Sequence, residues 1–123
     1  IFGNIISRQW FKNIIGKTLD KMGLQFGCQP ENIIAGIAPS LGPCCSEFVN
    51  YKDEIPQNLW RYKIKGKDYF NFWEISRDQL REKGVKKNNI QNMEICTKCN
   101  TEMFYSFRKE KTTGRFACVI SMV

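Results

Sequence analysis

The segment 38–45 combines residue types that often bind anions. It places the Ser40 hydroxyl and the backbone N–H of Gly42 between two prolines, directly after the apolar run 33–37. Prolines and a glycine should end a buried strand in a stiff, sharply shaped loop. Loops at strand ends are where α/β proteins commonly bind ligands. Ser40 and Gly42 are therefore candidate substrate-positioning residues, although the same pattern also suits a purely structural turn.

A second candidate anion site lies near the end of the chain. Arg108 and Arg115 flank a polar turn that contains Thr113. If the aromatic segments 105–108 and 115–120 pair as a hairpin, the two guanidinium groups lie side by side. Guanidinium groups bind phosphate and carboxylate through paired N–H donors. We therefore expect Arg108, Thr113 and Arg115 to hold an anion, with a solvent-exposed hairpin tip as the alternative.

The chain has six cysteines and no histidine, so it offers no imidazole for base catalysis or metal binding. Cys96 and Cys99 have the spacing of a redox dithiol or of half a zinc knuckle. The other cysteines are Cys28, Cys44, Cys45 and Cys118. Neighbouring cysteines such as 44 and 45 seldom bind one tetrahedral ion, and a redox pair should open a helix after a buried strand. We therefore expect ordinary thiols and assign no metal ligand.

Two helices can be predicted from apolar spacing and from their ends. Apolar residues recur with helical period over 11–26, and Gly27 is a favourable terminator. Asn71 is a candidate N-cap for a helix over 72–83, with Glu74 three residues later as in a capping box. The residues expected to be buried on this second helix are Phe72, Ile75, Ser76 and Leu80.

Strands are expected between and after these helices. The apolar run 33–38 predicts a short strand covered on both faces. Segments 60–64 and 68–70 predict strands around a glycine turn, and 90–96 predicts a further strand. With the final hairpin, this alternation predicts an α+β fold with layered helices and a mixed sheet.

The composition is that of one ordered domain over residues 1–123. Hydrophobic residues make up 42% and charged residues 25%, values close to those of ordinary globular proteins. No apolar stretch approaches the roughly 20 residues that span a bilayer, and no leader is visible, so we expect a cytoplasmic protein. The net charge of +7 is scattered along the chain, which disfavours a nucleic-acid footprint. The start at Ile1 suggests an incomplete or processed chain.

Several separated blocks, in one order, resemble the C-terminal half of the YfiH/DUF152 family. The blocks are Ile37-Ala38-Pro39-Ser40-Leu41-Gly42-Pro43-Cys44-Cys45, Phe72-Trp73-Glu74, Cys96-Thr97, Phe104-Tyr105-Ser106-Phe107-Arg108 and Thr113-Gly114-Arg115. The resemblance implies a partial domain of a mixed-sheet α/β/β/α sandwich. It also implies a zinc-dependent purine nucleoside phosphorylase that cleaves adenosine, inosine and methylthioadenosine with phosphate and deaminates adenosine. Copper and a laccase-like oxidation have also been attributed to the family.

The family's zinc is held by two histidines and a cysteine, which the resemblance places in the missing N-terminal half and in a His-Ala-Gly-Trp-Arg-Gly segment. Here Ile6-Ser7-Arg8-Gln9-Trp10 keeps only the tryptophan. We therefore expect a metal-free chain that is inactive alone and needs its missing half or a second copy. Its substrates would be a purine nucleoside and phosphate. The alternatives are a nucleotide- or nucleic-acid-binding module that uses exposed aromatic residues and a copper oxidoreductase, which the lack of histidine disfavours.

Overall fold

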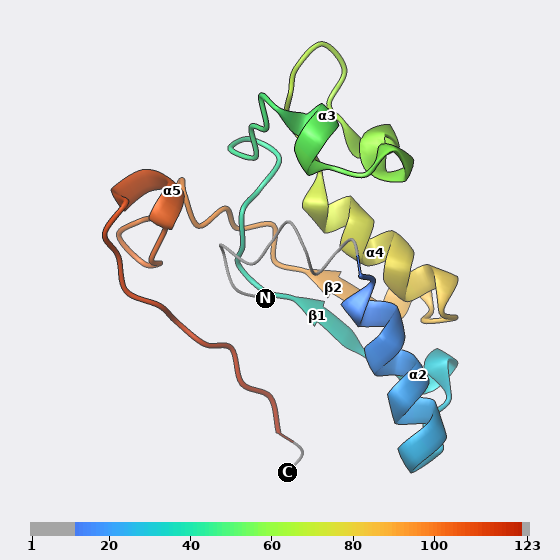
Figure 1. Cartoon of the computed structure of the whole chain (residues 1–123). Helices are drawn as coiled ribbons and strands as arrows, with labels where there is room; N and C mark the ends of the chain where they lie inside the picture. Colours follow the sequence, from blue (N-terminus) through green and yellow to red (C-terminus); the bar gives the residue numbers. More distant parts are fainter. Residues whose placement is uncertain (1–11, 122–123) are drawn as a thin grey trace.

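The computed structural model describes residues 12–121 (Figure 1). In chain order its elements are α2 (Ile14–Phe26), β1 (Ala35–Ile37), α3 (Tyr51–Glu54), α4 (Phe72–Glu82), β2 (Ile90–Asn92) and α5 (Phe107–Glu110), with short 3₁₀ helices at Pro30–Asn32, Gln57–Tyr62 and Lys87–Asn89. Among the described residues, no helix has the length and apolar character needed to cross a membrane.

Strands β1 and β2 pair in parallel and form a two-stranded sheet within the described residues. Helix α4 contacts both strands and also α2, so the two long helices lie together on one side of the sheet (Figure 1). Ala35 and Ile37 are half-buried, whereas Gly36 between them is exposed. The prediction of a strand buried on both faces is therefore wrong for β1, because the described helices cover only one face.

The helix predicted over 11–26 ends at the predicted residue but begins later, at Ile14, where an unpredicted N-cap residue starts it. In α2 the Asn13 side chain accepts a hydrogen bond from the Gly16 N–H at 2.9 Å. Gly27 then ends the helix at φ 65°, a left-handed conformation that glycine adopts without steric cost. The predicted first turn, at Phe11, lies outside the described residues.

Helix α4 connects the two apolar clusters of the core. The Asn71 side chain caps it by accepting from the Glu74 N–H at 3.1 Å. Its four predicted inward residues are all buried. Phe72 and Ile75 belong to a cluster with Ile55, Leu59, Tyr62 and Phe70, and Leu80 packs with Leu19 and Val85. The predicted helix is thus confirmed, and it carries the core on one face.

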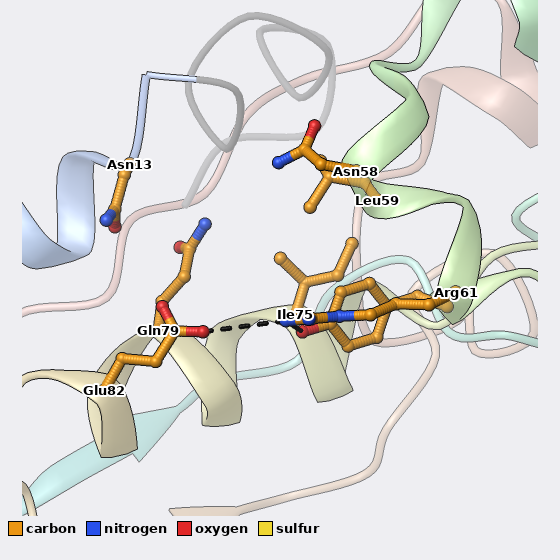
Figure 2. A pocket seen from close by; sticks show the side chains of 8 residues that line it. Asn13, Asn58, Leu59, Arg61, Ile75, Gln79 and Glu82 are labelled. Atoms are coloured by element: carbon orange, nitrogen blue, oxygen red, sulfur yellow. Dashed lines mark hydrogen bonds and ion pairs between the residues drawn. The ribbon is translucent and has the colours of Figure 1, made fainter.

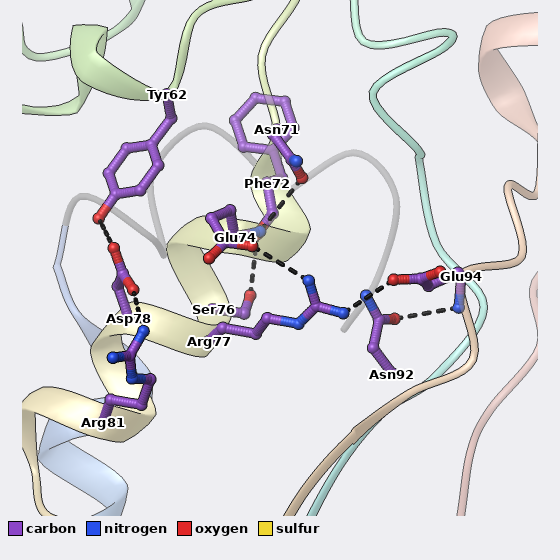
Figure 3. Close-up of polar contacts among 10 residues, drawn as sticks. All are labelled: Tyr62, Asn71, Phe72, Glu74, Ser76, Arg77, Asp78, Arg81, Asn92 and Glu94. Carbon is purple, nitrogen blue, oxygen red and sulfur yellow. Dashed lines mark hydrogen bonds and ion pairs between the residues drawn. The ribbon is translucent and has the colours of Figure 1, made fainter. Parts of the chain in front are cut away.

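Polar side chains on the other side of α4 join it to its surroundings (Figure 3). Arg77 donates to Glu74 at 3.1 Å and to Glu94, beyond β2, at 2.8 Å. The Tyr62 hydroxyl donates to Asp78 at 2.8 Å. The Arg77 pair with Glu94 is largely exposed, and such pairs contribute at most about 1 kcal/mol. These polar contacts fix the orientation of α4 relative to its neighbours and contribute little to the free energy of unfolding.

Segment 60–64 does not form the predicted strand. The chain forms the 3₁₀ helix Gln57–Tyr62 because Leu59 and Tyr62, three residues apart, are both buried by a helix with three residues per turn. A single antiparallel bridge, Lys63 to Phe70, is what remains of the predicted pairing. The Ile64 N–H donates to the Tyr69 carbonyl at 2.7 Å, so the predicted turn between the two segments is present.

The predicted hairpin at the end of the chain is also wrong. Residues Phe107–Glu110 form the short helix α5, and 111–121 have no regular secondary structure. Aromatic contacts replace a strand ladder here: the Phe104 and Phe116 rings lie 5.5 Å apart, and Gly114 packs on the Tyr105 ring. The alternating aromatic pattern thus reflects side-chain packing.

Candidate functional site

The segment after β1 runs beside the segment after β2. The Ser40 N–H donates to the Ile95 carbonyl at 3.1 Å, and the Thr97 N–H donates to the Ser40 carbonyl at 3.0 Å. This parallel pairing at Ser40 and Cys96 continues the direction of the sheet beyond Glu94, whose φ of 54° ends β2 earlier than predicted. The two loops that follow are therefore held next to each other.

Ser40 and Gly42, the two candidate residues of the first loop, both contact protein groups. The Ser40 hydroxyl accepts a hydrogen bond from the Trp73 indole N–H at 2.8 Å. The Gly42 N–H donates to the sulfur of Cys96 at 3.3 Å. Gly42 is buried against the Trp73 ring, and an added Cβ would lie 2.9 Å from it. The Ser40 hydroxyl can still donate its own proton to a ligand.

Four thiols meet where these loops lie side by side. The four-cysteine cluster consists of Cys44, Cys45, Cys96 and Cys99. All four sulfur atoms lie within 4.8 Å of one another, and the Cys99 sulfur is 3.6 Å from that of Cys44 and 3.4 Å from that of Cys45. Sequence reasoning considered a shared zinc site for these residues and rejected it, because neighbouring cysteines seldom bind one ion. The signal that could have joined them is that each pair lies a few residues beyond the end of one of two neighbouring parallel strands.

Three thiols of the four-cysteine cluster, those of Cys44, Cys45 and Cys96, differ in the direction in which their surroundings shift the pKa. Burial opposes ionisation of Cys96, but N–H donors from Gly42, Cys99 and Lys98 stabilise its thiolate and lower its pKa to about 7. Burial, followed by a hydrogen bond with Cys99, raises the pKa of Cys45 to about 11. The pKa of Cys44 is also raised, by burial and then by hydrogen bonds with neighbouring thiols. Without a bound cation, the cluster therefore favours one thiolate, located on Cys96.

The candidate residues near the end of the chain have separate surroundings. Arg108 lies over the Phe48 ring, 4.6 Å from its centre, and donates to the Glu47 carbonyl at 2.9 Å. The Thr113 hydroxyl donates to Glu110 at 2.8 Å. This hydrogen bond, together with the Ser106 N–H, holds the pKa of Glu110 below its usual value. Arg115 is exposed. No hairpin places the two arginines opposite each other, because α5 and an irregular segment take its place.

A small pocket of about 140 Å³ lies between α4, the 3₁₀ helix at Gln57–Tyr62 and the start of α2 (Figure 2). Its polar lining includes Arg61, Gln79 and Glu82. Arg61 donates to the Tyr62 hydroxyl at 2.7 Å and lies 3.6 Å from the Glu82 carboxylate. Sequence reasoning missed this pocket because its walls come from three segments that no single motif connects.

Comparisons with known proteins identify relatives of this chain. Purine nucleoside phosphorylase YlmD of Geobacillus stearothermophilus is 31% identical over 103 residues, which cover 74% of this chain and 36% of that protein. Purine nucleoside phosphorylase YfiH of Escherichia coli is 29% identical, with coverages of 80% and 42%. Purine nucleoside phosphorylase LACC1 of Homo sapiens is 28% identical, with coverages of 79% and 25%. The chain thus spans less than half the length of these relatives.

A solved structure also resembles this chain. The Bacillus licheniformis hypothetical protein YfiH matches 80% of this chain with a TM-score of 0.64 and 25% identity, and the match covers 40% of that protein. This likeness confirms the predicted α+β fold of the YfiH type. Residues 8–123 match the family described as multi-copper polyphenol oxidoreductase laccase. The chain therefore belongs to this family, and the similar proteins of Escherichia coli and Bacillus licheniformis are named YfiH.

Proposed function

We propose that this chain forms part of a purine nucleoside phosphorylase and contributes surface that faces a purine nucleoside and phosphate. The observation that carries the proposal is that relatives from two bacteria and from human are each named purine nucleoside phosphorylase, and they align with at least 74% of this chain. The reaction class is phosphorolysis, in which phosphate replaces the purine base on the ribose. Adenosine, inosine and methylthioadenosine are the expected substrates, with adenosine deamination as a further activity.

The proposed contribution of this chain is anion binding and positioning. Arg115 is exposed and therefore accessible to phosphate. Arg108 uses one N–H group on the Glu47 carbonyl, and its guanidinium carries five such donors in all. The Ser40 hydroxyl retains its proton and would add a neutral hydrogen bond, whereas Thr113 would first have to release Glu110, to which it donates. The Gly42 N–H supports the loop through Cys96. The net charge of +7 would attract phosphate to the chain over a longer range.

The residues present do not fit the zinc site that the family resemblance implies. That site needs two imidazole ligands, and these 123 residues contain no histidine. The candidate metal ligands that converge in the described part of the chain are all thiols. We therefore assign no metal-dependent step to this chain. Any imidazole ligand must come from outside these 123 residues, in the same polypeptide or in another.

The proposal is tested by measuring adenine release from adenosine with and without phosphate. The purified 123-residue chain alone should release no adenine above the blank. Sustained, phosphate-dependent turnover by this chain alone would show that the assignment of the missing ligands is wrong.

Anion binding is tested by titrating the chain with inorganic phosphate and following backbone amide shifts by NMR. Arg115→Ala should weaken phosphate binding at least several-fold. Lys67→Ala is the matched control, because Lys67 is also exposed but lies in the turn between Ile64 and Tyr69. Equal effects of the two variants would mean that phosphate responds only to net charge, and the proposed role of Arg115 would be withdrawn.

A further inference from the structure

We propose that the four-cysteine cluster binds one zinc ion through four thiolates, and that this site is structural. It differs in ligands from the histidine-containing zinc site implied by the family resemblance, and it goes beyond the proposed nucleoside chemistry. Its function would be to hold the loop after β1 against the turn after β2.

The distances within the cluster suit a tetrahedral metal. A Zn–S bond is about 2.3 Å, so an ideal tetrahedron separates its sulfur atoms by about 3.8 Å. The separations from Cys99 to Cys45 and to Cys44 are 3.4 and 3.6 Å, and no pair exceeds 4.8 Å. Shifts of less than about 1 Å, within reach of small χ1 rotations, would complete the site. A disulfide, with sulfur atoms about 2.05 Å apart, requires a larger approach.

The backbone explains how two neighbouring cysteines can face one ion. In an extended strand Cys44 and Cys45 would point to opposite sides. Here they lie in a turn, closed by the Cys45 N–H, which donates to the Gly42 carbonyl at 3.0 Å. Of the second pair, Cys96 is the residue that bridges to Ser40, and Cys99 ends the turn at 97–99 that follows it. The pairing of Ser40 with the strand-end segment holds the two turns together, so the site is formed before a metal binds.

The surroundings support thiolate ligands. The Gly42 N–H points to the Cys96 sulfur at 3.3 Å, and such outer contacts orient and stabilise a metal-bound thiolate. Cys96 is 5% exposed, whereas Cys44 and Cys99 are exposed, so the site is anchored on its inner side and open to an incoming ion. Four thiolates and Zn²⁺ carry a net charge of −2, which a chain of charge +7 tolerates.

The donor set also selects the metal and its role. Soft thiolates favour zinc, copper(I) or iron–sulfur chemistry over magnesium or calcium. Four protein ligands fill the tetrahedral coordination of zinc and leave no position for water or substrate. The expected consequence is stabilisation of the two loops rather than catalysis.

The test uses the full 123-residue chain, purified under reducing conditions without a histidine tag. Elemental analysis should give one zinc per chain, released by a thiol-blocking mercurial. Cys45→Ser and Cys99→Ser should each lower the zinc content at least tenfold at equal chelator concentration. Cys28→Ser and Cys118→Ser are the matched controls, because these two thiols lie outside the cluster, and they should retain one zinc per chain.

A second measurement does not depend on the variants folding. Cobalt(II) added to the metal-free wild-type chain should give the intense sulfur-to-cobalt charge-transfer and tetrahedral ligand-field bands of a tetrathiolate site. The proposal is overturned if the reduced chain binds neither metal, if the bound metal is iron or copper, if mass spectrometry finds a disulfide within the cluster in the isolated protein, or if Cys45→Ser keeps its zinc. Each of these outcomes is independent of nucleoside turnover, so failure here and failure of the proposed function can be told apart.

Discussion

Gly42→Ala should destabilise the chain by about 1–3 kcal/mol, because this position has no room for a methyl group. An added Cβ would lie 2.9 Å from the Trp73 ring and 3.0 Å from the Cβ of Cys96. Carbon atoms normally approach to about 3.5–4.0 Å. Neither neighbour is a flexible chain end: the indole of Trp73 is held by Ser40, and the Cys96 Cβ is attached to paired backbone. The overlap must therefore move the loop or the helix.

Urea unfolding of the reduced chain measures this effect, and Gly36→Ala is the matched control. A Cβ at Gly36 would have no atom within 4 Å, and its φ lies outside the left-handed region. That variant should be neutral or stabilised by up to about 1 kcal/mol, because alanine lowers the entropy of the unfolded chain. A destabilisation of about 2 kcal/mol at Gly42 corresponds to a change of roughly 30-fold in the folded-to-unfolded ratio. Equal stabilities of the two variants would refute the packing reasoning.

Three further predictions concern hydrogen bonds and ionisation. Trp73→Phe removes the donor to Ser40 and should lower the free energy of unfolding by about 1 kcal/mol in urea titrations; adding Ser40→Ala should then cost little more, and full additivity would contradict the contact. Asn71→Ala should cost about 1 kcal/mol by loss of the bond from the Glu74 N–H, and Asn71→Ser should recover most of it; an unchanged unfolding midpoint would exclude the cap. In the reduced, metal-free chain, thiolate absorbance should rise with a midpoint near pH 7, the pKa of Cys96, and Cys96→Ser should remove this step. Because this pKa lies below the ordinary 9.0, the thiolate stabilises the fold fully above about pH 9, and this stabilisation is lost as the pH falls through 7; identical pH dependence of unfolding in both proteins would contradict this.

Local signals predicted the two long helices well. The N-cap Asn71, the inward residues of α4 and the terminator Gly27 all act within a few residues of their own position, so the sequence pattern contains the information needed to place them. The family resemblance was also readable, because blocks such as 37–45 keep their residue types in order.

Pairing of strands was predicted less well, because it depends on partners far along the chain. The aromatic segments 105–108 and 115–120 have the residue pattern of a hairpin. Instead, α5 begins at Phe107, and Phe116 packs against the Phe104 ring. Likewise, segment 60–64 has β-type residues, and burial of Leu59 together with Tyr62 favours a 3₁₀ helix there. Tertiary burial outweighs a weak local preference in both places.

By itself, the sequence determined the capped helices, the family and the lack of any imidazole ligand, since each depends on residue identity or on short spacings. The meeting of the four thiols was decided by tertiary structure. Cys45 and Cys99 are 54 positions apart, and their sulfur atoms lie 3.4 Å from each other because two parallel strands end at the same edge of the sheet. A spacing of two residues can identify half of a metal site, but only the pairing of Ser40 with Cys96 brings the second half to it.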